Sequence, residues 1–406
     1  MKKPSILIIF LTVFIDLVGF GLILPLIPIF SKNFNAPGWM IGGIMASYSL
    51  MQFIFAPIWG RLSDRIGRRP ILLGSTACAS VSYALFAYGC GLQDEKALWI
   101  ILASRMFAGI CGANISVAQA YIADITPPEK RSARMGLIGM AFGLGFIFGP
   151  ALGAVSIIYF GLSGPGWTAA TLCALNFFSA LIILRESWKP AAHYVEQRPH
   201  FAQFVHTLRQ PALRLLIGIF FLATFAFTCF ETTIGWLVGD VFNLDLTKDK
   251  SVQTIAWLIV YCGVLGALVQ GGLTGRLVKK MGEPKLISIS LILAAIGIGA
   301  MPFSSTWTIL LIGLGIFAVG SSLARPPVFG MISLLTPRTE QGATMGVAQG
   351  VGSLARIIGP IFAGSLYDQH RSLPYVICAV VLFFTGLFAA QYLRKAAPAS
   401  PEGTAN

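Results

Sequence analysis

Charged residues are scarce in this sequence. Only 11% of its 406 residues are Asp, Glu, Lys or Arg, and 56% are hydrophobic, whereas a soluble domain carries about 25% charged residues. A soluble globule of this composition would lack the polar residues that cover a water-facing surface. The composition therefore excludes an ordinary soluble fold and favours a chain whose surface lies in lipid.

The residue types that build enzyme and metal sites are also sparse. The four histidines, His193, His200, His206 and His370, fall in predicted loops, and the seven cysteines fall in apolar runs. No metal-ligand cluster is visible, and no Gly-Lys-Ser/Thr phosphate loop is present, which excludes a self-contained ATP-driven pump. We expect no disulfide framework, no metal, no cofactor and no enzyme activity.

Long apolar runs dominate the rest of the chain. A helix needs about 20 mostly apolar residues to cross the hydrocarbon of a bilayer, and such runs predict an all-α membrane protein. The twelve predicted spans cover residues 5–31, 38–60, 70–91, 97–123, 134–160, 166–185, 211–241, 252–274, 285–304, 306–335, 343–367 and 373–393. The first is too long for a signal-peptide core and carries Asp16, so we expect it to be retained.

The basic residues are unevenly distributed over the predicted loops. With a cytoplasmic N-terminus, 21 of the 29 Lys and Arg lie on the cytoplasmic side, 5 on the opposite side and 3 inside spans. Cytoplasmic loops of membrane proteins carry such an excess, so we expect both termini in the cytoplasm. This distribution accounts for the net charge of +13 without a nucleic-acid partner. Short loops without a usable glycosylation triplet favour a bacterial inner membrane.

The chain divides into two similar halves. The longest polar segment, 186–210, separates a predicted N-terminal six-helix bundle (1–185) from a predicted C-terminal six-helix bundle (211–394). Apolar residues recur at helical spacing within that linker, which predicts a short amphipathic helix on the membrane surface. Residues 395–406 are predicted to be a disordered cytoplasmic tail.

Motifs repeat between the two halves. Residues 125–127 (Ile-Thr-Pro) align with 335–337 (Leu-Thr-Pro) at a shift of 210, and 60–62 (Gly-Arg-Leu) with 275–277 at a shift of 215. The second shift also carries Asp16 onto Glu231. Internal duplication, with a site between the repeats, is typical of secondary transporters.

Four segments resemble the major facilitator superfamily. Residues 60–70 (GRLSDRIGRRP) resemble its signature loop, and 105–112 (RMFAGICG) its fourth-span arginine motif. Residues 145–154 (GFIFGPALGA) are similar to its fifth-span antiporter motif, with Ala154 where a second glycine is usual. The first span, with Asp16 followed by glycines and prolines, resembles the twelve-span drug:proton antiporters, the tetracycline exporters included. The resemblance implies twelve helices in two pseudo-symmetric six-helix bundles, the major facilitator fold.

Five charged residues lie in the middle of predicted spans: Asp16, Arg105, Glu231, Arg325 and Arg356. Each costs about 2.5–3.5 kcal/mol on insertion scales, so each calls for a reason. Burial favours the neutral form of Asp16 and a nearby cation its charged form, and the resemblance implies that Arg105 lies close to it and that the pair couples transport to protons. The alternative is a permanent ion pair that fixes helix register. Glu231 is a second candidate proton site, a contact for a cationic substrate, or the partner of an arginine.

The C-terminal half combines two mid-span arginines with one mid-span glutamate. One interpretation is that Arg325 or Arg356 binds an anionic group of the substrate. The alternative is that both share Glu231, or that one reaches Asp240 or Asp368. The third and ninth spans also lack the carboxylates of the tetracycline exporters, which argues against simple tetracycline export.

The segment 60–70 is predicted to be a gate rather than a binding site. We expect Asp64 to start the turn, Gly67 to permit tight backbone geometry and Arg68 to bridge to Asp124. The resemblance implies that this network stabilises the outward-open state; the alternative is that the arginines only anchor the loop in the cytoplasm. The second copy, 275–282, keeps basic residues but loses the acid, so we expect stronger gating on the N-terminal side. The predicted gating residues are Gly60, Asp64, Arg65, Gly67, Arg68, Arg69 and Asp124.

Small and polar residues complete the predicted site. Polar side chains and two aromatic residues are predicted to line a substrate cavity, namely Gln52, Asn114, Gln119, Gln270, Gln349, Trp236 and Tyr48. Lipid-facing or core positions are the alternative for the aromatic residues. Glycines let helices approach closely, and prolines kink them. The predicted helix-packing residues are Gly145, Gly149, Pro150, Gly153, Gly359 and Pro360.

The sequence thus predicts a secondary active transporter. We expect a proton-coupled antiporter that exports amphipathic drugs or related organic compounds by alternating access. The alternative is a dedicated exporter or importer of one metabolite, such as a siderophore or an organic anion. We expect a monomer whose partners are a small-molecule substrate and membrane lipid, with the proton as coupling ion.

Overall fold

The computed structural model describes residues 6–23, 38–92, 96–112, 114–188, 200–244 and 249–396. These residues form helices and short connections, and none of them lies in a strand. Among them, 11 helical stretches are long and apolar enough to cross a membrane, and α3 (Gly38–Ile66) is a further helix of 29 residues. The prediction of an all-α, multi-pass membrane protein is confirmed.

The described part of the first half contains seven of the longer helices. The predicted fourth span is divided, because the helix is interrupted at Gly112. The helices are α1 (Ile6–Ile23), α3, α4 (Arg68–Gly91), α5 (Lys96–Cys111), α6 (Asn114–Ile125), α7 (Arg131–Phe160) and α8 (Gly164–Ile183), with the short η2 (Pro128–Lys130) before α7.

The second half follows the same plan. A short helix in the linker, α9 (His200–Arg209), precedes it, and a π-helical turn, η3 (Val269–Leu273), divides the predicted eighth span. The remaining helices are α10 (Pro211–Phe242), α11 (Asp249–Leu268), α12 (Thr274–Met281), α13 (Glu283–Ala300), α14 (Trp307–Leu335), α15 (Gln341–Tyr367) and α16 (Leu373–Ala396), with η4 (Met301–Phe303) and η5 (Arg338–Glu340).

The segment 60–70 is not the loop that the sequence predicted. α3 continues to Ile66 and α4 begins at Arg68, so that only Gly67 leaves the helical conformation, with φ of 101°. The expectation that Asp64 starts a turn is therefore wrong, because Asp64 lies in the last turns of α3. The hydrophobic run ends near residue 60, but a polar helix end can project beyond the hydrocarbon, and Arg65 there complements the helix dipole.

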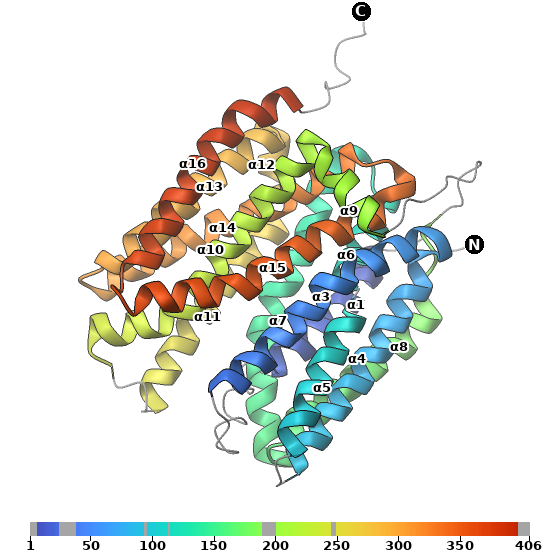
Figure 1. The fold of residues 1–406 in the computed structure, drawn as a ribbon, viewed down its shortest axis with the longest axis horizontal. Helices are drawn as coiled ribbons and strands as arrows, with labels where there is room; N and C mark the ends of the chain where they lie inside the picture. Colours follow the sequence, from blue (N-terminus) through green and yellow to red (C-terminus); the bar gives the residue numbers. More distant parts are fainter. Residues whose placement is uncertain are drawn as a thin grey trace, which may run out of the picture.

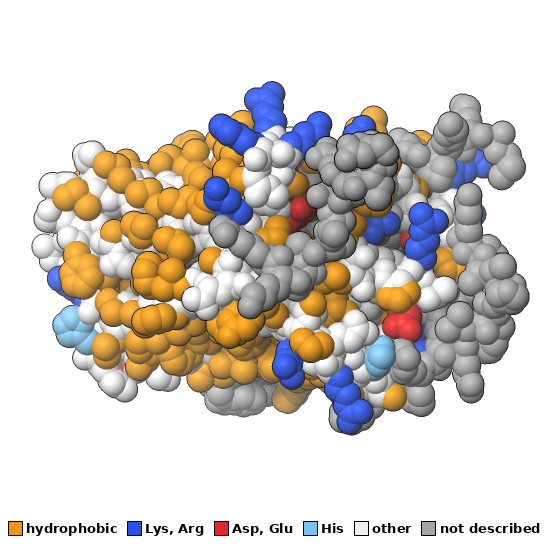
Figure 2. All heavy atoms as spheres, turned by 90° about the horizontal axis from the view of Figure 1, so that it is seen from above, with side chains coloured by type: hydrophobic (Ala, Val, Ile, Leu, Met, Phe, Trp, Pro, Cys, Tyr) orange, Lys and Arg blue, Asp and Glu red, His pale blue; other side chains and the backbone are white. Residues whose placement is uncertain are grey.

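The two halves lie side by side as two groups of helices, α1–α8 and α10–α16 (Figure 1). α3 packs along α15, and α7 packs against α11, α12 and α14. With twelve spans, α1 begins and α16 ends at the same end of the bundle, which we call the terminal end. Figure 2 shows that hydrophobic side chains cover much of the described surface in that view, as a lipid-facing protein requires.

The predicted packing residues act within each half. A Cβ at Gly145 would meet the carbonyl oxygen of Leu17 at 2.9 Å, and Gly149 lies directly against the backbone of Gly21 in α1. A Cβ at Gly359 would meet Thr228 of α10 at 3.1 Å. These glycines therefore allow the close packing of α1 on α7 and of α15 on α10. The close contact between α3 and α15, which we call the seam between the halves, is lined by Gly60, Gly342 and Gly346 instead. The helices α7 and α15 continue through Pro150 and Pro360.

Candidate transport site and gate

A cluster in the N-terminal half surrounds Arg105. This side chain is only 2% exposed, and its guanidinium lies over the rings of Tyr48 and Phe20, at 4.9 and 5.7 Å from the ring centroids. Such cation–π contacts stabilise a desolvated cation. Asp16 is half-buried in α1 and lies within electrostatic range of Tyr48 and Tyr83. The structure thus brings Asp16 and Arg105 into one cluster through Tyr48.

A second cluster lies in the C-terminal half. Glu231 is exposed in the middle of α10 and lies within electrostatic range of Arg356 in α15 and Arg325 in α14. Within the described part of the chain, no cation approaches the Glu231 carboxylate to within the 4.0 Å of an ion pair. Both arginines are half-buried, and Arg325 lies over the ring of Phe227 at 5.2 Å. The two arginines therefore do not form a close ion pair with Glu231 in this conformation.

The predicted cavity residues lie in several different environments. Gln119 accepts a 3.1 Å hydrogen bond from Gln349 across the halves. Gln270 is buried, and its side chain fills the space that Gly139 of α7 leaves. Trp236 is exposed, and its ring is tilted by 59° against that of Tyr367, with the ring centroids 5.5 Å apart. The Tyr367 hydroxyl donates to Asp240 at 2.6 Å. The Asn114 side chain lies outside the described residues. A role of this set in substrate binding stays a prediction.

Arg68 is the centre of the predicted gate. Its side chain is fully buried and forms a 3.0 Å ion pair with Asp124 and a closer one with Asp64. A third bond, of 2.7 Å, goes to the hydroxyl of Ser63. A buried cation is tolerated only when it is paired and hydrogen bonded, and the two carboxylates meet this requirement. The expected bridge between Arg68 and Asp124 is present.

Asp64 connects this network to the other half of the molecule. Its carboxylate accepts hydrogen bonds from the backbone N–H groups of Gly342 and Ala343, at 2.9 and 2.7 Å. These donors begin α15, where the first N–H groups of a helix have no partner within the helix and the dipole favours a negative charge. Gly60 lies directly against the backbone of Gly342, so neither position has room for a side chain. Burial raises the pKa of Asp64 to about 6, despite Arg68.

Glu186 was not among the predicted gating residues, but it binds the backbone of residues 60–70, which we call the signature segment. Its carboxylate accepts hydrogen bonds from the backbone N–H groups of Arg68 and Arg69 at 2.9 and 3.0 Å, and from Ser187 and Trp188 at 2.9 Å. It thereby caps the N-terminus of α4 and ties the start of the linker to the gate. An acid directly after the sixth span was the available signal.

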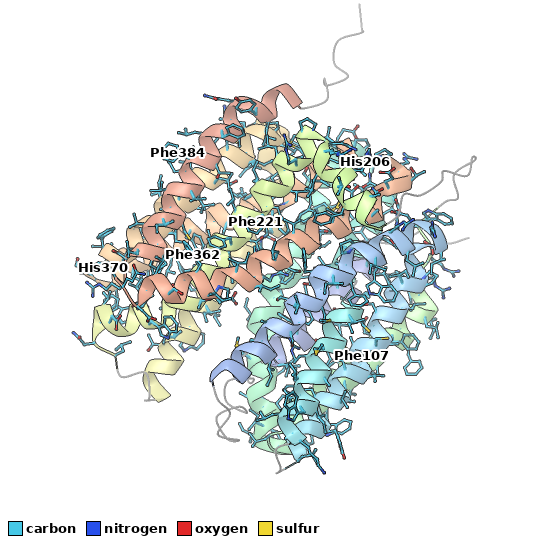
Figure 3. The ribbon with its side chains drawn as sticks, viewed as in Figure 1. Phe107, His206, Phe221, Phe362, His370 and Phe384 are labelled. Atoms are coloured by element: carbon cyan, nitrogen blue, oxygen red, sulfur yellow. The ribbon has the colours of Figure 1, made fainter. Side chains whose placement is uncertain are left out.

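Further contacts between the halves were also missed. Arg131, at the start of α7, donates to the carbonyl oxygen and the hydroxyl of Ser333 in α14, at 3.0 and 3.1 Å. Ser132 donates to Glu283 at 3.1 Å. The contacts of Arg131 and Ser132, together with those of Asp64, close the terminal end. Of the four histidines, His206 in α9 and His370 after α15 lie near opposite ends of the molecule (Figure 3).

Two helical halves with interior charges and one interlocked end define a secondary membrane transporter. The chain belongs to the major facilitator superfamily, because the family model "Major Facilitator Superfamily" matches residues 9–283 and 246–406. It is 33% identical over 384 residues to the class C tetracycline resistance protein of Escherichia coli, covering 92% of each chain. It is 29% identical over 387 residues to multidrug resistance protein 2 of Bacillus subtilis, covering 94% of this chain and 93% of that protein.

A solved structure supports the same assignment. The crystal structure of the human organic anion transporter MFSD10 (TETRAN) matches with a TM-score of 0.81 and 25% identity, covering 96% of this chain and 100% of that chain. The predicted major facilitator fold and the resemblance to drug:proton antiporters of the tetracycline-exporter type are confirmed. Proteins of this superfamily are transporters and generally not enzymes.

Proposed function

We propose that this protein is a proton-coupled antiporter that exports amphipathic organic compounds by alternating access between its two halves. The observation that carries the proposal is the placement of Asp16 and Glu231, which the internal repeat relates, in the middle of α1 and α10. Each belongs to a cluster with an arginine of its own half. A carboxyl group whose hydration and charged neighbours alternate can take up a proton on one side and release it on the other.

The orientation follows from charge. The terminal end carries the Arg-rich signature segment, and an excess of Arg and Lys favours the cytoplasmic side, so both termini face the cytoplasm. The interlocked terminal end then corresponds to an outward-facing conformation. We assign the protein to a bacterial inner membrane, as a monomer with membrane lipid and a small-molecule substrate as its partners. It uses the proton as coupling ion, requires no cofactor and has no catalytic activity.

Collapse of an imposed proton gradient in inside-out vesicles tests this function. Addition of transported compounds, drawn from a panel of amphipathic fluorescent dyes, should dissipate the gradient with the wild type. Asp16→Asn should abolish this response while the protein remains in the membrane. Asp368→Asn, which alters an exposed carboxylate at the end of α15, is the control and should respond as the wild type does. Retained pH-dependent transport by Asp16→Asn would refute the assignment.

Organic anion transport is the second candidate. Arg325 and Arg356 lie close enough to repel each other. Among the described residues, Glu231 is the carboxylate near them, and it is not in ion-pair contact with either arginine. An anionic group of a substrate would therefore relieve the repulsion. The likeness to the human organic anion transporter MFSD10 supports this alternative. A fluorescent aryl carboxylate should bind the purified protein, and Arg325→Gln and Arg356→Gln should weaken binding about tenfold, the effect of about 1.4 kcal/mol. Equal weakening for the neutral amide of the same probe would exclude an anion site.

A further inference from the structure

One amide side chain joins the two halves near the centre of the molecule. Gln52 of α3 is only 2% exposed. Its Oε1 accepts hydrogen bonds from Nη1 of Arg356 at 3.1 Å and from the hydroxyl of Ser353 at 2.9 Å, both in α15. Its Nε2 lies 3.4 Å from the hydroxyl of Tyr48 and 3.4 Å from the carbonyl oxygen of Gly112, both in the N-terminal half. Gln52 therefore connects Arg356 to the opposite half.

Gln52 belongs to the same seam as the gate. The positions Gln52, Ala56, Gly60 and Asp64 recur every four residues and so share one face of α3. Along that face, Gly346 of α15 lies against the carbonyl oxygen of Ala56, and Gly342 lies against Gly60. Gln52 and Asp64 are 12 residues apart, or about 18 Å along the helix axis. Separation of α3 from α15 along the whole of this face would therefore also break the Gln52–Arg356 contact.

Arg356 has a second neighbour, Glu231, whose ionised form carries the opposite charge. Glu231 lies within its electrostatic range but outside ion-pair distance, and the Glu231 side chain is exposed. The long guanidinium side chain of Arg356 is directed instead to Gln52 of the other half. A neutral amide is a weaker partner for a cation than a carboxylate is, so the contact holds Arg356 in place only while the seam is closed.

The helices packed against α10 supply the other groups around Glu231. α14 contributes Arg325, whose guanidinium rests on the ring of Phe227. α16 contributes Tyr375, which is hydrogen bonded to Thr233 on another face of α10. α9 contributes His206, which is hydrogen bonded to Gln210 at the terminal end. α11 contributes Tyr261, which donates a hydrogen bond to the carbonyl oxygen of Leu311. Arg356 is thus the cation near Glu231 whose described partner lies across the seam.

We propose that Gln52 is a positioning residue that holds Arg356 away from Glu231 while the terminal end is closed. When α3 and α15 separate, Arg356 loses Gln52 and pairs with Glu231. This inference rests on the proposed role of Glu231 as a proton site. In the closed state no cation is in contact to stabilise the Glu231 carboxylate, so the group binds a proton more readily than in the open state. In the open state the ion pair stabilises the carboxylate, and the proton passes to water at the terminal end.

The direction agrees with proton-driven export. The conformation that is closed at the cytoplasmic side loads a proton from outside, and opening to the cytoplasm releases it. The coupling arises from an exchange of partners by one arginine, so no chain of proton-conducting groups between the two clusters is needed. Gln52 acts through Arg356 and does not itself carry the proton.

Infrared titration of the protonated carboxyl band of the purified protein tests this proposal. Glu231→Gln identifies the part of the band that belongs to Glu231. A charge of opposite sign within about 4–6 Å shifts the titration of a carboxyl group by roughly 1–3 pH units. Gln52→Leu frees Arg356, so we expect this band to titrate at a pH at least about one unit lower than in the wild type.

The chain offers a matched control. Gln119→Leu also removes an amide hydrogen bond between the halves, the one that Gln119 accepts from Gln349. Both partners of this bond are neutral, so its loss frees no cation. Its titration midpoint should equal that of the wild type, whatever its transport rate. Gln52→Glu retains an acceptor for Arg356 and should titrate at or above the wild-type midpoint, which keeps the proposal testable if the leucine variant fails to fold.

The outcomes separate two possible failures. A wild-type spectrum without any band that Glu231→Gln removes would overturn the proposed proton site itself. A Glu231 band whose midpoint is the same in Gln52→Leu and the wild type would overturn only the role of Gln52. A midpoint lowered equally by Gln52→Leu and Gln119→Leu, or lowered by Gln52→Glu, would also overturn it.

Discussion

Ser132 at the start of α7 donates a 3.1 Å hydrogen bond to Glu283 at the start of α13. The repeat shift of 210 carries Ser132 onto Gly342 in the C-terminal half. The backbone N–H of Gly342 donates to Asp64 in the N-terminal half. The second copy of the signature segment has lost the acid that corresponds to Asp64, but Glu283, directly after its Gly282, restores an acidic contact between the halves. Two of the contacts that hold the terminal end are therefore related by the repeat but chemically different.

The weaker of these contacts should be measurable on its own. Glu283→Gln replaces a charged acceptor by a neutral one, and a hydrogen bond to a charged group contributes about 1.5–3 kcal/mol. Because Glu283 is only half-buried, we expect the lower end of this range, about a tenfold shift toward the open terminal end. Electron–electron distance measurements between spin labels at the exposed positions Ile66 and Arg338 would report it. Glu129→Gln, an exposed acid nearby, is the control, and an equal shift there would contradict the prediction.

Asp64→Asn should have a larger effect on the same distance distribution. Both carboxylate oxygens of Asp64 accept from backbone N–H groups of α15, and the nitrogen of an Asn side chain, unlike a protonated carboxyl oxygen, cannot accept a hydrogen bond. A buried donor that loses its acceptor in this way costs about 1–3 kcal/mol. We expect a predominantly open terminal end and a lower melting temperature in detergent. A distribution closer to the wild type than that of Glu283→Gln would show that Asp64 is not the principal contact.

The closed terminal end should be favoured by acid. Burial raises the pKa of Asp64 from 3.8 to about 6 in the closed conformation, and hydration on opening returns this pKa toward its ordinary value. The closed state then binds more protons between these two values, so its stability is greatest at low pH and is lost as the pH rises through about 6. The spin-label distances of the wild type in nanodiscs should shift toward the open form between about pH 4 and pH 6. Asp64→Asn should reduce this pH dependence, and an unchanged pH profile in that variant would remove Asp64 as its cause.

The close approach of α3 and α15 predicts a steric effect. A Cβ at Gly60 would collide with the backbone of Gly342, and a backbone cannot move aside as a flexible side chain can. Gly60→Ala should therefore prevent closure and reduce transport strongly. Gly74→Ala is the matched control, because a Cβ at Gly74 meets no atom within 4 Å, and it should be neutral or stabilise α4 by about 0.5–1 kcal/mol. Comparable losses of transport by the two variants would show that the contact is not essential.

Local pattern accounts for most of the helices. The hydrophobic runs predicted the spans closely, for example 166–185 against the observed α8 of Gly164–Ile183, because the length of a membrane helix is set by the bilayer. The pattern was less informative where a polar helix end leaves the hydrocarbon, as at Asp64. It was also silent on the interruption at Gly112 and on the π-helical turn at 269–273.

The sequence by itself determined that this is a duplicated helical membrane transporter, and it identified the interior charges and the Arg68–Asp124 bridge. These features depend on composition, repeat spacing and motif, which are properties of the linear chain. Only the tertiary structure decided which groups meet across the halves: Asp64 with the start of α15, Ser132 with Glu283, and Gln52 with Arg356. The physical reason is that these contacts join residues 151–304 positions apart, and their existence depends on how closely two glycine-lined helices can approach.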